Sequence, residues 1–431
     1  MFPLMMIYLA LVLIRPQDYP AYAGAIPVPL QQVTLLLAGV AWLLSRQKAV
    51  SAPQNMLLIA FVLTMMVSVA VNGWLGGAVP ILRDFTPVVL AYFLLANACT
   101  SRRRVVTAMA VTTLCASVLV VHGIDQSASG IGWTGVGLSE GTRIQYVGIF
   151  SDPNDLGMLF VMCVPMALYL SHGGGWLGLR WLLWMVVTAG LVYGIYLTDS
   201  RGTILALLAI FGVYLWLQRG IVVAGLLGVI GLVGLKAMPS RMQELEVGEE
   251  SAMDRVYSWY AGLQMFQGKP LLGVGKGAYT DIHQLTAHNS LVLVLAEMGI
   301  VGFTLWLAFM GYCLWMMATV ATWRPQPGMG PQEYGLDDAS LVQWNQDRRV
   351  AVTLLLSLCA FMVCAFFLSR SYVITLYLFA GILVAHYSGM RSRYRFLPEF
   401  KLSKNILLWP MVAVAGAIVL YVVVRVLLAL S

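Results

Sequence analysis

Long apolar stretches recur along the whole chain and constrain its fold more than any other feature. Each stretch is long enough to cross the roughly 30 Å hydrocarbon core of a bilayer as a helix, which takes about 17–25 residues. Hydrophobic residues make up 60% of the 431 residues and charged residues only 10%, against about 45–50% and about 25% in soluble globular proteins. The sequence therefore predicts an all-α polytopic membrane protein.

We expect about 12–13 transmembrane helices, which form a single transmembrane domain over residues 1–431. The expected spans are 2–14, 28–45, 55–72, 80–98, 104–122, 154–171, 180–198, 203–218, 220–238, 290–320, 350–369, 371–389 and 406–428. The first span is expected to be a retained helix rather than a signal peptide, because no small-residue cleavage site follows it. The six cysteines lie in apolar segments without metal-ligand spacing, so we expect neither disulfide bonds nor a zinc site.

The distribution of charge predicts which side of the membrane each loop faces. With the N-terminus in the cytoplasm, the inner loops hold 15 of the 26 basic residues and only five acidic residues. This asymmetry satisfies the positive-inside rule, which the reversed topology fails. The net charge of +7 is therefore explained by membrane topology, and we expect no nucleic-acid partner.

Two loops on the expected outer side, 123–153 and 239–289, are much longer than most other connections. Long loops in a compact domain are usually functional or disordered. In the second loop, apolar residues recur at helical spacing, which predicts an amphipathic helix along the membrane surface with Arg255 beside its apolar face. The apolar residues are Ala252, Val256, Trp259, Leu263 and Phe266.

Three polar elements on the expected outer side have the chemistry of a site. Ser200-Arg201-Gly202 lies between two apolar helices, where an arginine offers a planar fork to phosphate beside a helix N-terminus. Arg255 lies in the long loop, and His288 precedes the next apolar helix. A neutral imidazole can accept a proton from a hydroxyl. Each element also has an ordinary interpretation. Ser200-Arg201-Gly202 fits a polar turn whose arginine extends to the lipid headgroups, Arg255 fits a cation on a surface helix, and His288 fits a passive neighbour of a helix N-cap.

Other polar motifs have simpler interpretations. Gly273-Val274-Gly275-Lys276-Gly277 resembles a phosphate loop, but a glycine follows Gly-Lys where serine or threonine is required, and the segment is expected outside, where ATP is absent. Asp152 and Asp155 offer two carboxylates, but Asp152 before Pro153 fits a helix N-cap. We therefore expect no nucleotide hydrolysis, no metal and no cofactor. Arg370 lies near a membrane edge, which makes it a candidate functional residue.

The order of several weak motifs adds a specific signal over about 140–310. The chain contains, in sequence, Gly148-Ile149-Phe150-Ser151-Asp152-Pro153-Asn154-Asp155-Leu156-Gly157, Ser200-Arg201-Gly202, Arg255 with Trp259, Pro270-Leu271-Leu272-Gly273-Val274-Gly275, and His288-Asn289 followed by Glu297-Met298-Gly299. The motifs occur in this order and are all expected on the outer side of the membrane, and in both respects the chain resembles the bacterial O-antigen ligase superfamily.

The resemblance implies a GT-C-type membrane glycosyltransferase of the bacterial inner (cytoplasmic) membrane, surrounded by membrane lipids, with its active site and both long loops facing the periplasm. It implies metal-independent, inverting transfer of a glycan from undecaprenyl pyrophosphate to lipid A–core in lipopolysaccharide biosynthesis. His288 matches the catalytic position, and Arg201 and Arg255 match positions that bind the donor pyrophosphate. Arg370 is expected to add to the pyrophosphate site.

Two alternatives stay open from the sequence. One is an O-antigen polymerase or a protein O-oligosaccharyltransferase of the same superfamily, because Arg15-Pro16-Gln17-Asp18 resembles members described as O-glycosylation ligases. The other is a transporter of lipid-linked glycans. Transporters tend to place polar residues near the bilayer midplane on broken helices, whereas the candidates in this chain gather at one face, which favours an enzyme.

Overall fold

The chain is built from helices in its described part, apart from two isolated bridges between single residues. The computed structural model describes residues 1–20, 29–45, 50–172, 178–226, 228, 245–328 and 330–430. Among these residues, nine helices are long and apolar enough to cross a membrane. The expected all-α polytopic class is therefore confirmed.

Helices of very different lengths follow one another along the chain. They are α1 Phe2–Ile14, α2 Leu30–Leu43, α3 Pro53–Val71, α4 Ala78–Ala98, α5 Arg102–Ser129, α6 Pro153–Ser171, α7 Leu179–Leu197, α8 Arg201–Arg219, α10 Leu245–Gly268, α11 Tyr279–Ile282, α12 Ser290–Thr322, α13 Asp338–Phe366, α14 Ile374–Arg393 and α15 Leu408–Leu430. Short 3-10 turns cover Pro16–Asp18, Leu75–Gly77, Gly148–Phe150, Pro331–Tyr334 and Leu402–Asn405.

Two helices extend beyond their predicted spans for local reasons. α5 continues past residue 122 to Ser129 and ends where Gly130 adopts a left-handed φ of 81°. α13 begins at Asp338 instead of residue 350, because the Asp337 carboxylate caps it by accepting the Ser340 N–H at 2.9 Å. The span expected over 220–238 falls largely outside the described residues.

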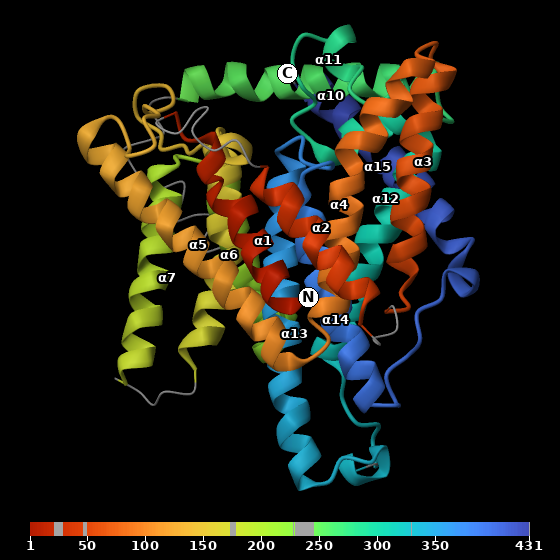
Figure 1. The fold of residues 1–431 in the computed structure, drawn as a ribbon. Helices are drawn as coiled ribbons and strands as arrows, with labels where there is room; N and C mark the ends of the chain where they lie inside the picture. Colours follow the sequence, from red (N-terminus) through yellow and green to blue (C-terminus); the bar gives the residue numbers. More distant parts are fainter. Residues whose placement is uncertain are drawn as a thin grey trace.

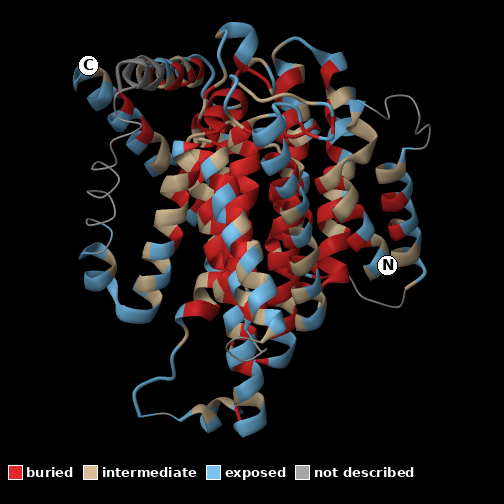
Figure 2. Cartoon of the chain, turned by 90° about the vertical axis from the view of Figure 1, so that its left-hand side faces the viewer, coloured by how far each residue is buried: buried red, intermediate tan, exposed pale blue. Residues whose placement is uncertain are grey.

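Most helices run side by side, and α10 lies across one end of this bundle (Figure 1). We refer to this end as the α10 end. Buried residues occupy the middle of the bundle, while its periphery is exposed (Figure 2). Much of that periphery is apolar, as with Leu179 of α7 at 73% exposed and Met411 of α15 at 69%. Such surfaces are suited to lipid.

The apolar face of α10 packs on protein. Val256, Trp259 and Leu263 are all buried, and the Trp259 ring meets that of Phe366 at 5.5 Å between centroids. The helix predicted from the apolar spacing is therefore present. The helix contacts α12 and α15, and its Trp259 meets the Phe366 ring at the end of α13, so its apolar face is covered by protein rather than directed to lipid.

A kink interrupts α12 at Gly299, whose φ is 60° and ψ is −166°. The segment just before α11 supplies the backbone hydrogen bonds that the kink removes. The N–H groups of Ile300 and Val301 donate to the carbonyls of Pro270 and Leu271, and those of residues 274 and 275 donate to the carbonyls of residues 296 and 297. The glycine-rich motif at 273–277 therefore has a structural explanation that involves no phosphate.

We expect Gly273→Ala to lower the free energy of unfolding by about 1–3 kcal/mol or to prevent folding. A Cβ on Gly273 would lie 2.3 Å from the carbonyl carbon of Glu297, at a φ of +67° that alanine rarely adopts. Gly268→Ala is the matched control, because a Cβ there meets nothing within 4 Å. Thermal unfolding of both variants in detergent tests this, and equal melting temperatures would contradict it.

Candidate active site

The residues singled out in the sequence converge at the α10 end. Arg255 on α10 interacts electrostatically with Arg201, the first residue of α8, and with Asp152 before α6. His288, just before α12, interacts with Arg255, Asp152 and Arg370. All of the predicted site residues therefore belong to one cluster, although separate segments of the chain supply them.

His288 is positioned by the start of α12. Asn289 or Ser290 could cap this helix by residue type, and Asn289 is the N-cap: its Oδ1 accepts the N–H groups of Leu291 at 2.8 Å and Val292 at 3.1 Å. His288 has a φ of 48°, in the left-handed region. Such a conformation is uncommon for a residue other than glycine, and it is enriched at functional sites.

The surroundings of His288 keep its imidazole neutral. Burial lowers the pKa of His288, the positive charges of Arg255 and Arg370 lower it further, and the negative charge of Asp152 partly opposes them. Because the ordinary pKa of histidine is about 6.5, a lowered value leaves the ring unprotonated at pH 7. The side chain is then able to accept a proton.

Arg201 and Arg255 bring two positive charges together. Arg201 is exposed and is the first residue of α8, where the free backbone N–H groups of a helix N-terminus also attract an anion. Arg255 is half-buried, and burial, Arg201 and Arg143 all lower its pKa. Unfavourable charge of this kind is relieved when an anion binds, so the pair is electrostatically prepared for an anionic ligand.

Arg370 lies between α13 and α14 and is held by both its main chain and its side chain. Its backbone N–H donates to Ser290 Oγ at 2.8 Å. Its guanidinium pairs with Asp152 at 3.1 Å and with Asp155. Burial acts to lower the pKa of Arg370, and the two carboxylates more than offset this, so the pKa is raised. Its Nη1 donates to the Ser369 carbonyl at 3.2 Å, so all three guanidinium nitrogens are engaged and Arg370 has fewer donors left for a ligand than Arg201 has.

Asp152 does more than cap α6. One carboxylate oxygen accepts the backbone N–H of Asn154 at 2.8 Å, which is the predicted N-cap bond, and the other pairs with Arg370. Asp155 is only 5% exposed and faces the same arginine. No group of three or more His, Cys, Asp or Glu residues suited to a metal ion occurs in the described ranges. The two aspartates thus act as counter-charges to Arg370.

Arg143 is a further member of the cluster, which the sequence analysis did not single out. Its Nε donates to the Thr198 carbonyl at 2.9 Å, and its Nη2 donates to Asn154 Oδ1 at 3.0 Å. It therefore joins the start of α6 to the turn that precedes α8. Its place in the long 123–153 loop was the only signal available. The cluster therefore contains four arginines, and Asp152, Asp155 and the exposed Glu140 pair with two of them.

His283 lies outside this cluster, although it occupies the same long loop as His288. Its Nε2 is 3.2 Å from Ser258 Oγ, and its ring stands edge-on to Tyr279 at 6.2 Å. The sequence-based preference for His288 rested on its position at the start of a helix. The structure places the arginines beside His288 as well.

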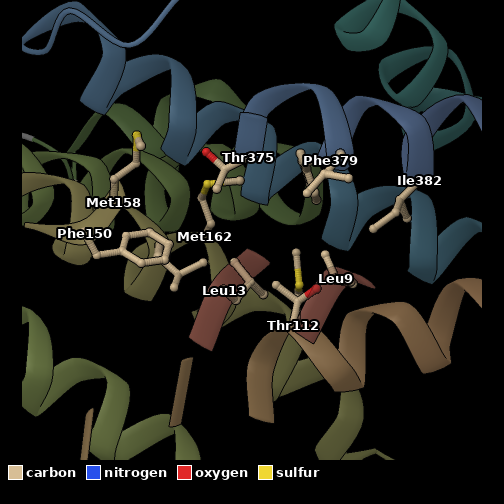
Figure 3. A pocket seen from close by; sticks show the side chains of 12 residues that line it. Leu9, Leu13, Thr112, Phe150, Met158, Met162, Thr375, Phe379 and Ile382 are labelled. Carbon is tan, nitrogen blue, oxygen red and sulfur yellow. The ribbon is translucent and has the colours of Figure 1, made fainter. Parts of the chain in front are cut away.

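An apolar cavity of about 30 Å³ lies among α1, α5, α6 and α14, lined by side chains such as Met158, Met162 and Phe379 (Figure 3). That volume corresponds to little more than one water molecule. The cavity is too small for a sugar or a pyrophosphate and has almost no polar lining. The polar cluster is therefore the candidate site for a glycan substrate.

Comparison with known proteins agrees with the motif order. The family model described as O-antigen ligase matches residues 185–307. This segment contains Arg201, Arg255 and His288, whereas Arg143 and Arg370 lie outside it. No curated protein matches the chain. The match confirms the resemblance drawn from the sequence, and residues 185–307 of the chain are similar to the O-antigen ligase family.

Proposed function

We propose that the protein transfers a glycan from undecaprenyl pyrophosphate to lipid A–core at the periplasmic face of the bacterial inner membrane. The observation that carries this proposal is the meeting of a neutral, half-buried histidine with several arginines at one end of a helical bundle. The family match supports glycan transfer by a membrane enzyme in general. The donor, the acceptor and the side of the membrane are our inference.

The proposed chemistry is a single displacement at the anomeric carbon. His288 takes the proton of the acceptor hydroxyl, whose oxygen then bonds to the anomeric carbon as the bond to the pyrophosphate oxygen breaks. The bonding electrons leave with the pyrophosphate, where Arg201 and Arg255 stabilise the developing charge. Arg370 contributes positive charge from its fixed position. Attack opposite the leaving group inverts the anomeric configuration, and no pair of glycosidase-type carboxylates is needed.

The profile of lipopolysaccharide in a deletion strain tests the proposed acceptor. A core without O-antigen is the expected result. A core that carries a single repeat unit would instead identify a polymerase, and intact lipopolysaccharide would point to a protein glycosylation enzyme or a transporter. The gathering of the candidate residues at one end of the bundle favours an enzyme over a transporter.

Single cysteines at exposed positions test the proposed sidedness. We expect Tyr257→Cys on α10 to react with a membrane-impermeant thiol reagent in spheroplasts, and Arg391→Cys at the end of α14 not to react. Arg391 belongs to the basic residues assigned to the cytoplasmic side, and the native cysteines are buried or half-buried, so background labelling should be low. Reversed labelling would overturn the proposed location of the site.

Turnover by the purified protein with a lipid-linked donor is expected to survive EDTA. The arginines supply the positive charge that a divalent cation would otherwise bring to the pyrophosphate, and Asp152 and Asp155 are engaged by Arg370. The measurement is the initial rate with and without chelator. Activity that is lost in EDTA and restored by Mg²⁺ or Mn²⁺ would make the two aspartates metal ligands.

A further inference from the structure

The connection between α13 and α14 lies between two regions of the α10 end, one formed by charged side chains and the other by aromatic rings. Arg370 points to Asp152 and Asp155 at the start of α6. Tyr372, two residues later, packs instead against Phe61 of α3 and Phe85 of α4, with ring centroids 6.1 and 6.2 Å away. Two residues span at most about 7 Å of chain. A side chain on the Tyr372 side is thus close to the proposed active site but outside the arginine cluster.

Lys276 occupies this second region. Its Nζ lies 5.5 Å from the ring centroids of both Phe85 and Tyr372. An aromatic face attracts an ammonium group without using its N–H donors. Lys276 makes no hydrogen bond or ion pair with any residue that the structure describes, and it is partly exposed. Its donors are therefore available to a ligand.

Glu297 is the buried carboxylate that interacts electrostatically with Lys276, and the geometry shows that the two groups are not in direct contact. Glu297 is 3% exposed, and its Oε1 accepts the backbone N–H groups of Gly277 at 2.9 Å and Tyr279 at 3.4 Å. The carboxylate also interacts with the hydroxyl of Tyr372. The Lys276 ammonium interacts electrostatically with this carboxylate but forms no ion pair or hydrogen bond with it, because it lies over the two rings. All three N–H donors of Lys276 therefore stay available to a ligand.

The segment that carries Lys276 is held rigidly. Gly275 N–H donates to the Glu297 carbonyl, Asn72 Nδ2 donates to the Gly273 carbonyl at 2.9 Å, and Gly277 N–H binds the Glu297 carboxylate. Little conformational freedom of the main chain remains to be lost when a ligand binds. Such preorganisation favours recognition of a group at a fixed place relative to His288.

We propose that Lys276 forms a second anion site, which binds a phosphate or carboxylate on the acceptor glycan while the arginine cluster holds the donor. This inference rests on the proposed function and names a property of its acceptor. The arginine cluster and Lys276 lie on opposite sides of the 369–373 segment. The pyrophosphate of the donor therefore binds the arginines, and the anionic group of the acceptor binds Lys276. The acceptor is then oriented with a neutral hydroxyl towards His288.

The test compares Lys276→Met with Lys276→Arg in lipid nanodiscs, with a purified acceptor glycolipid used either phosphorylated or after phosphatase treatment. We expect Lys276→Met to raise the KM for the phosphorylated acceptor by about tenfold, with donor binding and melting temperature unchanged, and Lys276→Arg to retain most of the affinity. Lys269→Met is the matched control on the same loop, because the Lys269 ammonium already binds Asn72. It should leave KM unchanged.

The dephosphorylated acceptor separates ligand binding from a structural role. Wild-type protein should bind it about tenfold more weakly, and Lys276→Met should cause no further loss. If dephosphorylation has no effect but reduction of the acceptor carboxylates to alcohols weakens binding in this way, the anion that Lys276 binds is a carboxylate. The proposal would be overturned if Lys276→Met raised the KM equally for the phosphorylated, dephosphorylated and reduced acceptors, or if it raised the KM for none of them. If wild-type protein transfers no glycan, the proposed function fails, and direct binding of the phosphorylated glycolipid still tests Lys276.

Discussion

His288→Ala is expected to slow glycan transfer by about 10²–10⁴-fold, the usual contribution of a positioned general base, and to leave donor binding nearly intact. The imidazole is neutral at pH 7 because burial and the neighbouring arginines lower its pKa. Protonation would remove the base. We therefore expect kcat/KM of the wild-type protein to fall only below the ordinary histidine value of about 6.5 as the pH is lowered.

Single-turnover rates and donor-lipid binding on the same purified variants measure the effect. His283→Ala is the matched control, because His283 lies in the same loop but binds Ser258 and is separate from the arginine cluster. Its turnover should stay near that of the wild type, and melting temperatures establish that both variants are folded. A folded His288→Ala protein with wild-type turnover would remove the histidine from the mechanism.

Arg201→Ala is expected to weaken donor binding and to lower kcat by about 10²–10³-fold, the usual loss when one group that stabilises transition-state charge is removed. Arg201 begins α8 beside the half-buried Arg255. Arg255→Ala should have a comparable effect. Lysine keeps the charge but lacks the planar fork, so Arg→Lys at either position should restore only part of the activity.

Arg219→Ala provides the matched control for Arg201→Ala. Arg219 is the last residue of the same helix and is likewise exposed, but it lies at the opposite end of α8. Its removal should change neither donor binding nor turnover. If Arg201→Ala and Arg219→Ala behave alike, with both proteins folded, Arg201 does not hold the donor.

Local signals in the sequence were sufficient for most of the fold. Hydropathy and length predicted the membrane-spanning helices, and residue type predicted the cap supplied by Asp152. The early start of α13 was missed because its first turns are polar and follow Asp337 rather than an apolar pattern. A hydropathy pattern finds the part of a helix that meets lipid and not the part that continues beyond it.

The candidate site was predicted where its residues mark local features and missed where only the folded chain brings them together. Arg201 and His288 stand at helix starts, which the sequence shows. Arg143 joins the site through Thr198, 55 positions later, and no local pattern predicts that bond. The pairing of Arg370 with Asp155, 215 positions away, is likewise a result of tertiary structure.

The hydrogen bonds at the kink in α12 bear on the order in which the site assembles. They link this helix to the segment immediately before it, whereas Arg370 must meet partners on a much earlier helix. Contacts between nearby parts of a chain form sooner than contacts between distant ones, and synthesis proceeds from the N-terminus. We therefore expect His288, at the start of α12, to be in place while α13 is still being inserted. Arg370 then pairs with Asp152 and Asp155 last, so the two carboxylates stay without this partner until the chain is nearly complete.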